Sequence, residues 1–317
     1  MARPLGASPE ASSGGAADSG IHSPFLAEHP RMIANAVLPD YTIRRTVPEV
    51  RIQFTVADNQ GRLLHSLSSG DLHILDDRVA VPQIRNFSRL DDLPLQVGLL
   101  LDASDSVQKA ATRERQAIHF FVQHVLRPQT DRAALMAFSS DFRLWQPSTG
   151  DPDALNQTLT KVRQLGFATF LYDGVYRACM EQFPASPEGD YAQRVLVLIT
   201  DGYDTGSLHT LADAVAAAQR SEVQIFALSV HSARIQADGD KALRRLADAT
   251  GGQFYLAASE KDFPAIFTAM EQQMRTQYSV SFQPATQARG LHAVSIEVAG
   301  GERLRVHARQ AYFYDAR

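Results

Sequence analysis

One short apolar run sets the strongest limit on how this chain can fold. Residues 97–101 read VGLLL, and an uninterrupted run of this kind is typical of a strand that is buried on both faces. A helical pattern follows, in which apolar side chains recur on one face between residues 118 and 126. Buried strands that alternate with helices need crossover connections, which favour a mostly parallel sheet covered by helices on both sides.

The same alternation continues to residue 275. Further strands are predicted at residues 133–138, 195–199 and 223–230, with helices at 153–163, 170–183, 209–220, 239–249 and 261–275. Residues 141–145, DFRLW, are predicted to form a short antiparallel strand at the sheet edge. The segment 94–276 is therefore predicted to be an α/β domain with a doubly wound, Rossmann-like sheet.

Both flanking segments show the two-residue period of half-buried strands. In the first segment, apolar side chains alternate with polar ones at Val50, Ile52, Phe54 and Val56. In the second, alternating runs occur at residues 278–282, 294–298 and 304–308. Because a small sheet with one bare apolar face is marginal alone, we expect residues 42–93 and 277–317 to form one β-sandwich of about seven strands. Two separate β extensions packed on the α/β domain are the alternative.

The N-terminal segment, residues 1–41, is predicted to be disordered. It begins MARPLGASPEASSGGAADSG, which offers almost nothing to bury and lacks the apolar middle region of a secretory signal. No apolar run in the chain approaches the ~20 residues that cross a bilayer. The net charge of −4 gives no basic field of the kind that binds nucleic acid. Either the protein stays in the cytoplasm, or its export signal lies outside the sequence as written.

Oxygen-bearing side chains follow the ends of two predicted parallel strands. Asp102, Ser104 and Ser106 come after the first buried strand, and Asp201 follows a later one. Ligands of open α/β sheets bind beyond the carboxyl ends of the strands, so these residues are expected at one rim. Thr169 lies in the loop before a helix. Two carboxylates and three hydroxyls are hard donors that suit Mg²⁺, with Ca²⁺ or Mn²⁺ as alternatives.

Asp102-Ala-Ser104-Asp-Ser106, Thr169 and Asp201-Gly202 together resemble the metal-ion-dependent adhesion site (MIDAS) of von Willebrand factor type A (VWA) domains. The resemblance implies that these residues hold a divalent ion directly or through water. It also implies that an Asp or Glu carboxylate of another protein completes the coordination sphere. The implied function is non-catalytic protein–protein binding, in adhesion or assembly, in an extracellular or periplasmic setting.

A narrower resemblance is to a bacterial, acidobacterial-type group of VWA-related proteins. The stretches DLPLQVGLLLDASDS, FATFLYDGV and LRVHARQAYFYD carry it, and the group has a β-rich segment on each side of the A domain. The chain departs from this group in two places. Asp105 stands where Gly is usual, and Phe167-Ala168 replaces a Gly-rich approach to the threonine. Asp105 either raises the metal affinity or repels an acidic partner.

Two other functions remain open. A Mg²⁺-dependent phosphohydrolase of the haloacid dehalogenase type also has an Asp after its first strand, but it would need a second Asp where this chain has Ser104. It would also need a phosphate-binding lysine, and Lys161 lies only in the broad region. A structural VWA domain with a degenerate metal site is the other reading. Asp173 and Asp204 are interpreted as a helix-start residue and a loop carboxylate, and Cys179 as a core residue.

Overall fold

The computed structural model describes residues 49–104, 108–183, 192–230, 237–299 and 304–315. The segment 1–41, predicted to be disordered, lies outside these residues. Within them, an α/β domain is flanked in sequence by two groups of antiparallel strands. Among the described residues, no helix is both long enough and apolar enough to cross a membrane.

The α/β domain is built on a six-stranded sheet with the order β10-β9-β8-β5-β6-β7. Its strands are β5 (Leu95–Asp102), β6 (Arg132–Phe138), β7 (Phe142–Thr149), β8 (Gln193–Ile199), β9 (Gln224–Ser229) and β10 (Phe254–Leu256). All neighbours pair in parallel except β6 and β7, which confirms the antiparallel edge strand expected at DFRLW. The strand β10 was not predicted, because three residues are too few to show a period.

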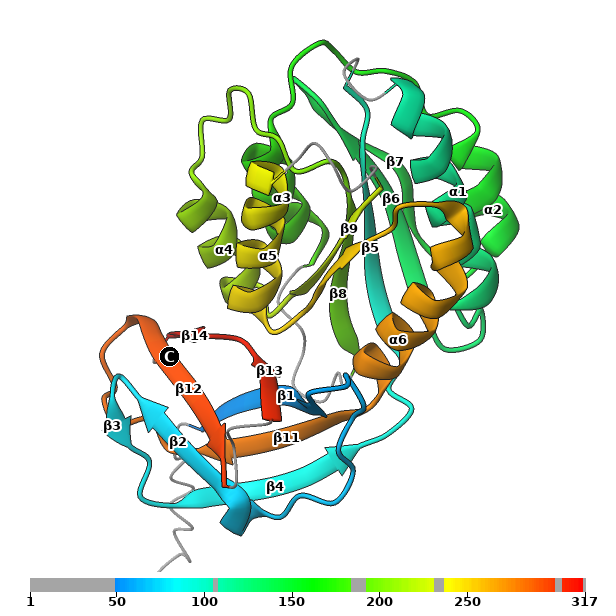
Figure 1. Ribbon diagram of the computed structural model, residues 1–317. Helices are drawn as coiled ribbons and strands as arrows, with labels where there is room; N and C mark the ends of the chain where they lie inside the picture. Colours follow the sequence, from blue (N-terminus) through cyan, green and yellow to red (C-terminus); the bar gives the residue numbers. More distant parts are fainter. Residues whose placement is uncertain (1–48, 105–107, 184–191, 231–236, 300–303, 316–317) are drawn as a thin grey trace, which may run out of the picture. The chain divides into compact units, whose positions relative to one another are not determined.

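Helices cover both faces of this sheet. They are α1 (Gln108–His124), α2 (Pro152–Leu159), α3 (Leu171–Gln182), α4 (Leu211–Arg220), α5 (Ala237–Thr250) and α6 (Phe263–Arg275). The first, second and sixth cover one face, and the other three cover the opposite face (Figure 1). Every residue of β8 is buried as a result, which explains why the central strands read as unbroken apolar runs. The predicted doubly wound α/β fold is confirmed.

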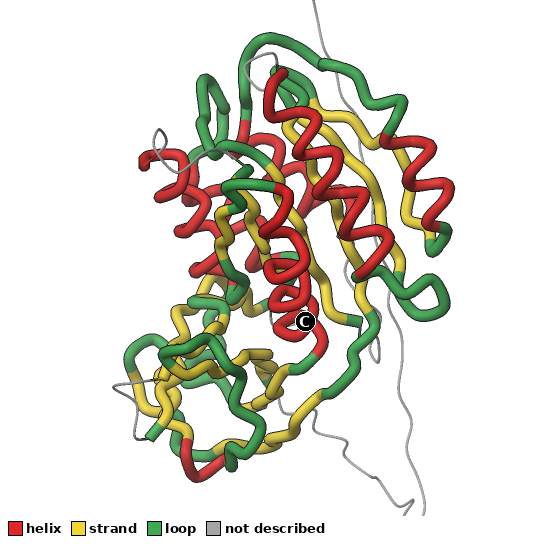
Figure 2. The backbone as a smooth tube through the Cα atoms, turned by 45° about the vertical axis from the view of Figure 1, so that its right-hand side comes forward, coloured by secondary structure: helices red, strands yellow, loops and turns green. Residues whose placement is uncertain are grey.

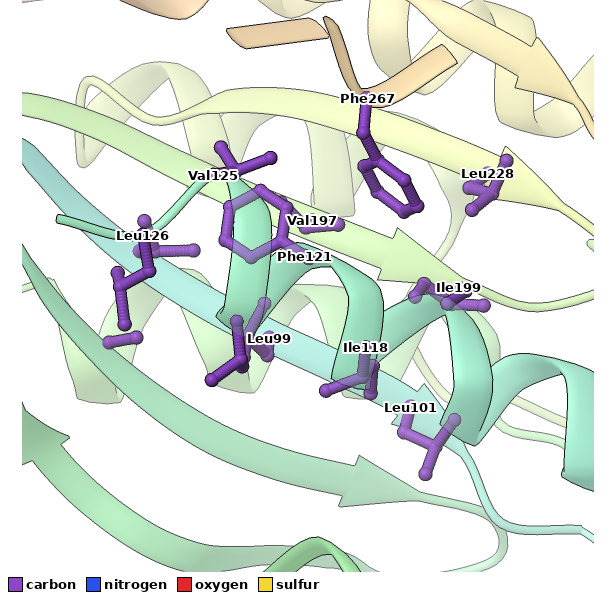
Figure 3. Packing of buried hydrophobic residues seen from close by; sticks show 14 of the residues in the cluster. Leu99, Leu101, Ile118, Phe121, Val125, Leu126, Val197, Ile199, Leu228 and Phe267 are labelled. Carbon is purple, nitrogen blue, oxygen red and sulfur yellow. The ribbon is translucent and has the colours of Figure 1, made fainter. Parts of the chain in front are cut away.

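The helix face predicted between residues 118 and 126 packs against the central strands. Ile118 and Phe121 of α1 lie over the sheet near Leu99 and Val197 (Figure 3). Both helix side chains are almost fully inaccessible to solvent. Removing this much apolar surface from water stabilises the fold by roughly 1.5–3 kcal/mol for each large side chain. The packing holds α1 against the central strands of the sheet.

The flanking strands form two four-stranded antiparallel sheets. One has the order β13-β1-β11-β4 and the other β14-β12-β2-β3. The strands are β1 (Val50–Asp58), β2 (Leu72–Asp76), β3 (Val79–Ala80), β4 (Ile84–Leu90), β11 (Gln277–Phe282), β12 (Gly290–Val298), β13 (Leu304–Ala308) and β14 (Ala311–Tyr314). Figure 2 separates the strands of both sheets from the helices by colour.

These two sheets share one core, to which each flanking segment contributes. Ile52 and Phe54 of β1 pack in the same cluster as Ile74 of β2, Val280 of β11 and Ile296 of β12. The expected β-sandwich is therefore confirmed, and the described part of the chain contributes eight strands to it where about seven were predicted. The strand β14 was missed because it reads AYFY, without the alternation that marks a half-buried strand. The division of the chain at residues 42, 94 and 277 stays a prediction.

Candidate metal centre

Asp102, the last residue of β5, is the anchor of the candidate site. Its side chain is buried, with 3% of the residue's surface exposed. The backbone N–H of Ser104 donates to Oδ1 at 2.9 Å, and the hydroxyl of Thr200 donates to Oδ2 at 2.8 Å. Thr200 directly follows β8, so these two hydrogen bonds tie the carboxylate to the ends of two neighbouring parallel strands.

The electrostatics at Asp102 favour a cation. Burial raises the pKa of this carboxyl group above its ordinary value, and the negative charge of Asp201 raises it further. Hydrogen bonds from Ser104 and Thr200 act in the opposite direction and are outweighed. Two carboxylates at one rim therefore repel each other, and a divalent cation between them would remove that cost.

Thr169 is held between the loops that follow β6 and β8. Its backbone N–H donates to the Thr205 hydroxyl at 2.8 Å, and the Thr205 N–H donates to its carbonyl oxygen at 2.8 Å. On the other side, the Ser139 hydroxyl donates to the carbonyl oxygen of Ala168 at 2.7 Å. The residue is 3% exposed. The geometry places the predicted threonine beside the loop that carries Asp201.

The loop before Thr169 also contacts the loop after β5. Ser104 forms an isolated parallel bridge with Gly166, and the N–H of Leu165 donates to the carbonyl oxygen of Ala103 at 3.1 Å. Four of the five predicted ligands thus lie at the carboxyl edge of the sheet: Asp102 ends β5, and Ser104, Thr169 and Asp201 lie on loops that are joined to one another or to Asp102 by hydrogen bonds. The fifth, Ser106, and its neighbour Asp105 lie outside the described residues.

The Asp201 loop depends on two glycines that approach each other closely. Gly202 has a φ of +85°, in the left-handed region, and a Cβ atom there would lie 2.5 Å from the carbonyl oxygen of Gly239. A Cβ atom on Gly239 would in turn lie 2.3 Å from the carbonyl oxygen of Asp201. Only glycine at both positions lets the first turn of α5 pack against this loop.

We predict that Gly202→Ala destabilises the fold by about 1–2 kcal/mol from the positive φ, and by more from the clash with backbone. The matched control is Gly61→Ala, because Gly61 has a φ of +80° but no atom within 4 Å of its would-be Cβ. Urea denaturation of both variants measures the difference. Equal losses in the two variants would contradict the close approach of the Asp201 loop to α5.

Asp173 and Asp204 fix the rim without belonging to the predicted ligand set. Oδ1 of Asp204 accepts from the N–H of Leu171 at 2.9 Å, at the start of α3. The carboxylate of Asp173 accepts from the N–H groups of Leu208 and His209 at 3.0 and 2.8 Å. The loop 203–209 is therefore fastened to α3 from both sides. The interpretation of Asp173 as a helix-start residue and of Asp204 as a loop carboxylate agrees with these contacts.

The four described residues offer carboxylate and hydroxyl oxygens only. This donor set fits a hard divalent cation such as Mg²⁺, Ca²⁺ or Mn²⁺ and does not fit a thiolate-seeking metal. Cys179, by contrast, is buried in α3, and burial raises the pKa of its thiol. This burial agrees with its predicted packing role.

Glu114 of α1 is an acidic residue near this site that the MIDAS pattern does not include. It is fully buried, and the charges of Asp102 and Asp201 both act on it. Its spacing from Ala117 and Ile118 places it on the apolar face of the helix. That spacing is visible in the sequence and is the signal from which this residue could have been identified.

A second acidic group occurs in the sandwich, where Asp76, Asp77 and His292 have potential ligand atoms within 4.8 Å of one another. The two ring nitrogens of His292 lie 2.7 Å from Oδ2 of Asp77 and 2.8 Å from the carbonyl oxygen of Ala288. Asp76 accepts from the Tyr312 hydroxyl at 2.8 Å. Burial lowers the pKa of His292, but these acceptors outweigh it and raise the pKa overall. The hydrogen bonds of His292 to its two acceptors and of Tyr312 to Asp76 account for the proximity of these side chains.

Several solved structures are similar to this chain. BatB from Bacteroides thetaiotaomicron is 18% identical, with a TM-score of 0.47 over 56% of this chain and 98% of that one. An aerotolerance-related membrane protein from Bacteroides fragilis is also 18% identical, with a TM-score of 0.45 over 57% and 98%. Proximal thread matrix protein 1 from the mussel byssus is 17% identical, with a TM-score of 0.49 over 61% of this chain and about half (49%) of that one.

A family model gives the assignment. The model of the von Willebrand factor type A domain matches residues 96–269, which is more than half of the chain. The matched segment contains all the predicted ligand residues, and it contains the sheet and its covering helices apart from Leu95 and the end of α6. The chain belongs to the von Willebrand factor type A domain family.

Proposed function

We propose that this chain is a non-catalytic protein-binding module that depends on one divalent ion. Asp102, Ser104, Ser106, Thr169 and Asp201 would hold Mg²⁺, or Ca²⁺ or Mn²⁺ in its place, and an Asp or Glu carboxylate of another protein would complete the coordination. The observation that carries the proposal is the buried Asp102 carboxylate, bonded to the end of β8 and repelled by Asp201.

The choice of ion rests on the donor chemistry of this chain. The mussel protein is described with a zinc-occupied MIDAS motif, and that description concerns the mussel protein. Here the proposed ligands are all carboxylate and hydroxyl oxygens, which favour hard cations. We further infer that the chain belongs to the acidobacterial-type group, on the motifs quoted above and on the β-rich segments on both sides of its A domain.

Exposed apolar side chains on the rim support a protein as the partner. Leu208 is 92% exposed and Phe167 is 84% exposed, and they are the two most exposed large hydrophobic side chains among the described residues. Tyr203 is 41% exposed. All three lie on the loops that carry Thr169 and Asp201. Apolar and aromatic residues around a charged centre are the composition of a protein interface, where they would surround the partner's carboxylate.

The phosphohydrolase alternative has less support at the same rim. The position of its second Asp holds Ser104, whose backbone N–H donates to Asp102. Lys161, the one lysine in the required region of the sequence, is exposed just after α2. We expect no Mg²⁺-dependent turnover of a generic phosphate ester, and metal-dependent turnover that Asp102→Ala removes would favour the enzyme instead.

Affinity capture in Mg²⁺ and in EDTA tests the binding function. The immobilised chain is expected to retain a partner in Mg²⁺ and to lose it in EDTA, and Asp102→Ala and Asp201→Ala are expected to abolish capture. The control is Asp141→Ala, since the Asp141 side chain is 62% exposed on a neighbouring loop. A partner that binds equally well in EDTA and to both variants would place recognition elsewhere on the chain.

A further inference from the structure

Glu114 is the most anomalous polar residue among those described. It lies on α1 with no exposed surface, and neither carboxylate oxygen has a hydrogen-bond partner in the described part of the chain. Buried polar groups in native proteins are hydrogen-bonded in the great majority of cases, and an unpaired one calls for a water or an ion. Packing alone does not explain it, because an apolar residue would fill the same volume without the cost of burying a carboxylate.

A cavity connects this residue to the proposed metal ligands. Its volume is about 300 Å³, and Glu114 lines it together with Asp102 and Ser104. The walls also include the side of α1 and the loop that follows α2. Space of this size holds several water molecules, each of which occupies roughly 30 Å³ in the liquid. Glu114 therefore lines a polar cavity that it shares with two proposed ligands, and its two carboxylate oxygens are buried.

The charges around Glu114 require compensation. Burial raises its pKa well above the ordinary value, and the negative charges of Asp102 and Asp201 raise it further. The neighbouring Arg115 lowers it, but its guanidinium donates to the carbonyl oxygen of Val162 at 2.9 Å. A cation held next to Asp102 would compensate all three carboxylates together.

We propose that Glu114 is a third acidic residue of the metal centre, whose carboxylate binds the divalent ion, or a water on that ion, from the α1 side of the cavity. This inference rests on the proposed function, because it concerns the same ion. It adds a residue that the five-residue MIDAS pattern lacks. The pattern offers two carboxylates to the ion from the ends of β5 and β8, and Glu114 adds one from the helix.

A third carboxylate at the ion is compatible in charge with an acidic partner. Two carboxylates already balance the charge of a divalent ion, and a third alone would make the site repel a partner's Asp or Glu. Arg115 and Arg163 line the same cavity and carry two positive charges. Counting them, the loaded site keeps a net positive charge. The rim can then attract an acidic partner while Glu114 holds the ion from inside.

Calorimetric titration of the metal-free full chain with MgCl₂ tests the inference. Glu114→Gln keeps the shape of the side chain and removes its charge, so the Kd for Mg²⁺ is expected to rise by roughly tenfold to a hundredfold, the cost typical of lost supporting groups at metal sites. Glu114→Met, which suits an apolar helix face, is the second variant should the first fold poorly. Glu181→Gln, on the exposed side of α3, is the matched control.

The melting temperature gives a second readout, in which the variant is expected to be more stable than the wild type without metal although it binds the metal more weakly. Without metal, Glu114→Gln is expected to melt at a higher temperature than the wild type, because a buried unpaired carboxylate is gone. With saturating Mg²⁺, its gain in melting temperature is expected to be smaller than that of the wild type. A residue with only a packing role would leave the metal-induced gain unchanged.

The outcomes separate this inference from the proposed function. If the wild type binds Mg²⁺, Asp102→Asn does not, and both Glu114 variants keep the wild-type Kd, the third carboxylate is overturned and the proposed function stands. If the wild type itself gives no saturable binding, both are overturned. A raised Kd in Glu114→Gln and Glu114→Met, with Glu181→Gln unchanged, supports the inference.

Discussion

Replacing Arg275 with methionine is expected to lower the free energy of unfolding by about 3–5 kcal/mol, the typical cost of removing one partner of a buried ion pair. Arg275 ends α6, and its side chain is 4% exposed. Its guanidinium lies 2.6 Å from Oδ2 of Asp131, whose side chain is fully buried. The methionine would fill part of the volume but would leave the Asp131 charge uncompensated.

The same guanidinium joins segments that lie far apart in the sequence. It donates to the carbonyl oxygen of Leu93 at 3.1 Å and to that of Val125 at 2.7 Å. Leu93 immediately precedes the α/β domain, and Thr276, which follows Arg275, leads into β11 of the sandwich. Loss of the arginine therefore removes hydrogen bonds at the point where the chain enters and leaves that domain, in addition to the ion pair.

The effect has a defined pH dependence. Burial alone would raise the pKa of Asp131, but hydrogen bonds from Arg275 and from the N–H groups of Arg127 and Leu95 hold it below its ordinary value of 3.8. A carboxylate with a depressed pKa contributes stability above its unfolded-state pKa and loses it as the pH falls through the folded-state value. The difference between wild type and Arg275→Met is thus expected to be full at neutral pH and to shrink at acidic pH, as the Asp131 carboxyl group protonates first in the variant and at lower pH in the wild type.

Urea denaturation at neutral and acidic pH measures this difference. The control is Arg62→Met, because Arg62 pairs with Asp58 at 2.8 Å while 74% of its side chain is exposed, and little change is expected there. The double variant Arg275→Met with Asp131→Leu should recover only the part of the loss that comes from the uncompensated Asp131 charge. It would still lack the hydrogen bonds that the two side chains make with backbone groups of Leu93, Leu95, Val125 and Arg127. A loss in Arg275→Met no larger than in Arg62→Met would contradict the assigned role.

The sequence predicts the α/β sheet well because a strand that is buried on both faces has an unbroken apolar run in its sequence. The runs 97–101 in β5 and 195–199 in β8 are apolar throughout, and each is followed by a polar residue at the carboxyl edge of the sheet. Alternation likewise identifies β12, whose side chains face core and solvent in turn, and β1, whose apolar residues alternate with polar ones in the sequence. Each of these signals is local, so a single sequence contains it.

Contacts between residues that are far apart in the sequence are harder to predict from the sequence alone. Arg275 and Asp131 are 144 residues apart, and nothing in either local sequence indicates that they pair. The approach of Gly239 to Gly202 is equally invisible before the fold is known. Glu114 is intermediate: its helical spacing indicates a core position, but only the fold places it at a cavity beside Asp102. The MIDAS pattern predicts the residues on the rim loops. It does not include residues of the helices that pack against those loops, such as Glu114 and Gly239.

Asp102→Asn and Asp201→Asn are each expected to weaken Mg²⁺ binding by at least about a hundredfold, because each removes a charged ligand and not only a supporting group. In the wild type, Mg²⁺ at a hundred times its Kd is expected to stabilise the fold by about 2.7 kcal/mol. Both variants should lose this gain. Asp102→Asn should also equal or exceed the metal-free wild type in stability, because it removes a buried carboxylate whose pKa burial has raised.

Calorimetric titration of the EDTA-treated, dialysed chain and thermal melts at millimolar Mg²⁺ measure these effects, with Asp141→Asn as the exposed control. The two variants also differ in what they disturb. Asp102 accepts hydrogen bonds from Ser104 and Thr200, so its replacement changes the contacts between loops, and Asp201 accepts from the N–H of Tyr203 within its own loop. Loss of binding in both variants, with the fold intact in Asp201→Asn, would assign the effect to the ion. A wild type without saturable heat or a metal-dependent melting temperature would instead identify a structural VWA domain with a degenerate site.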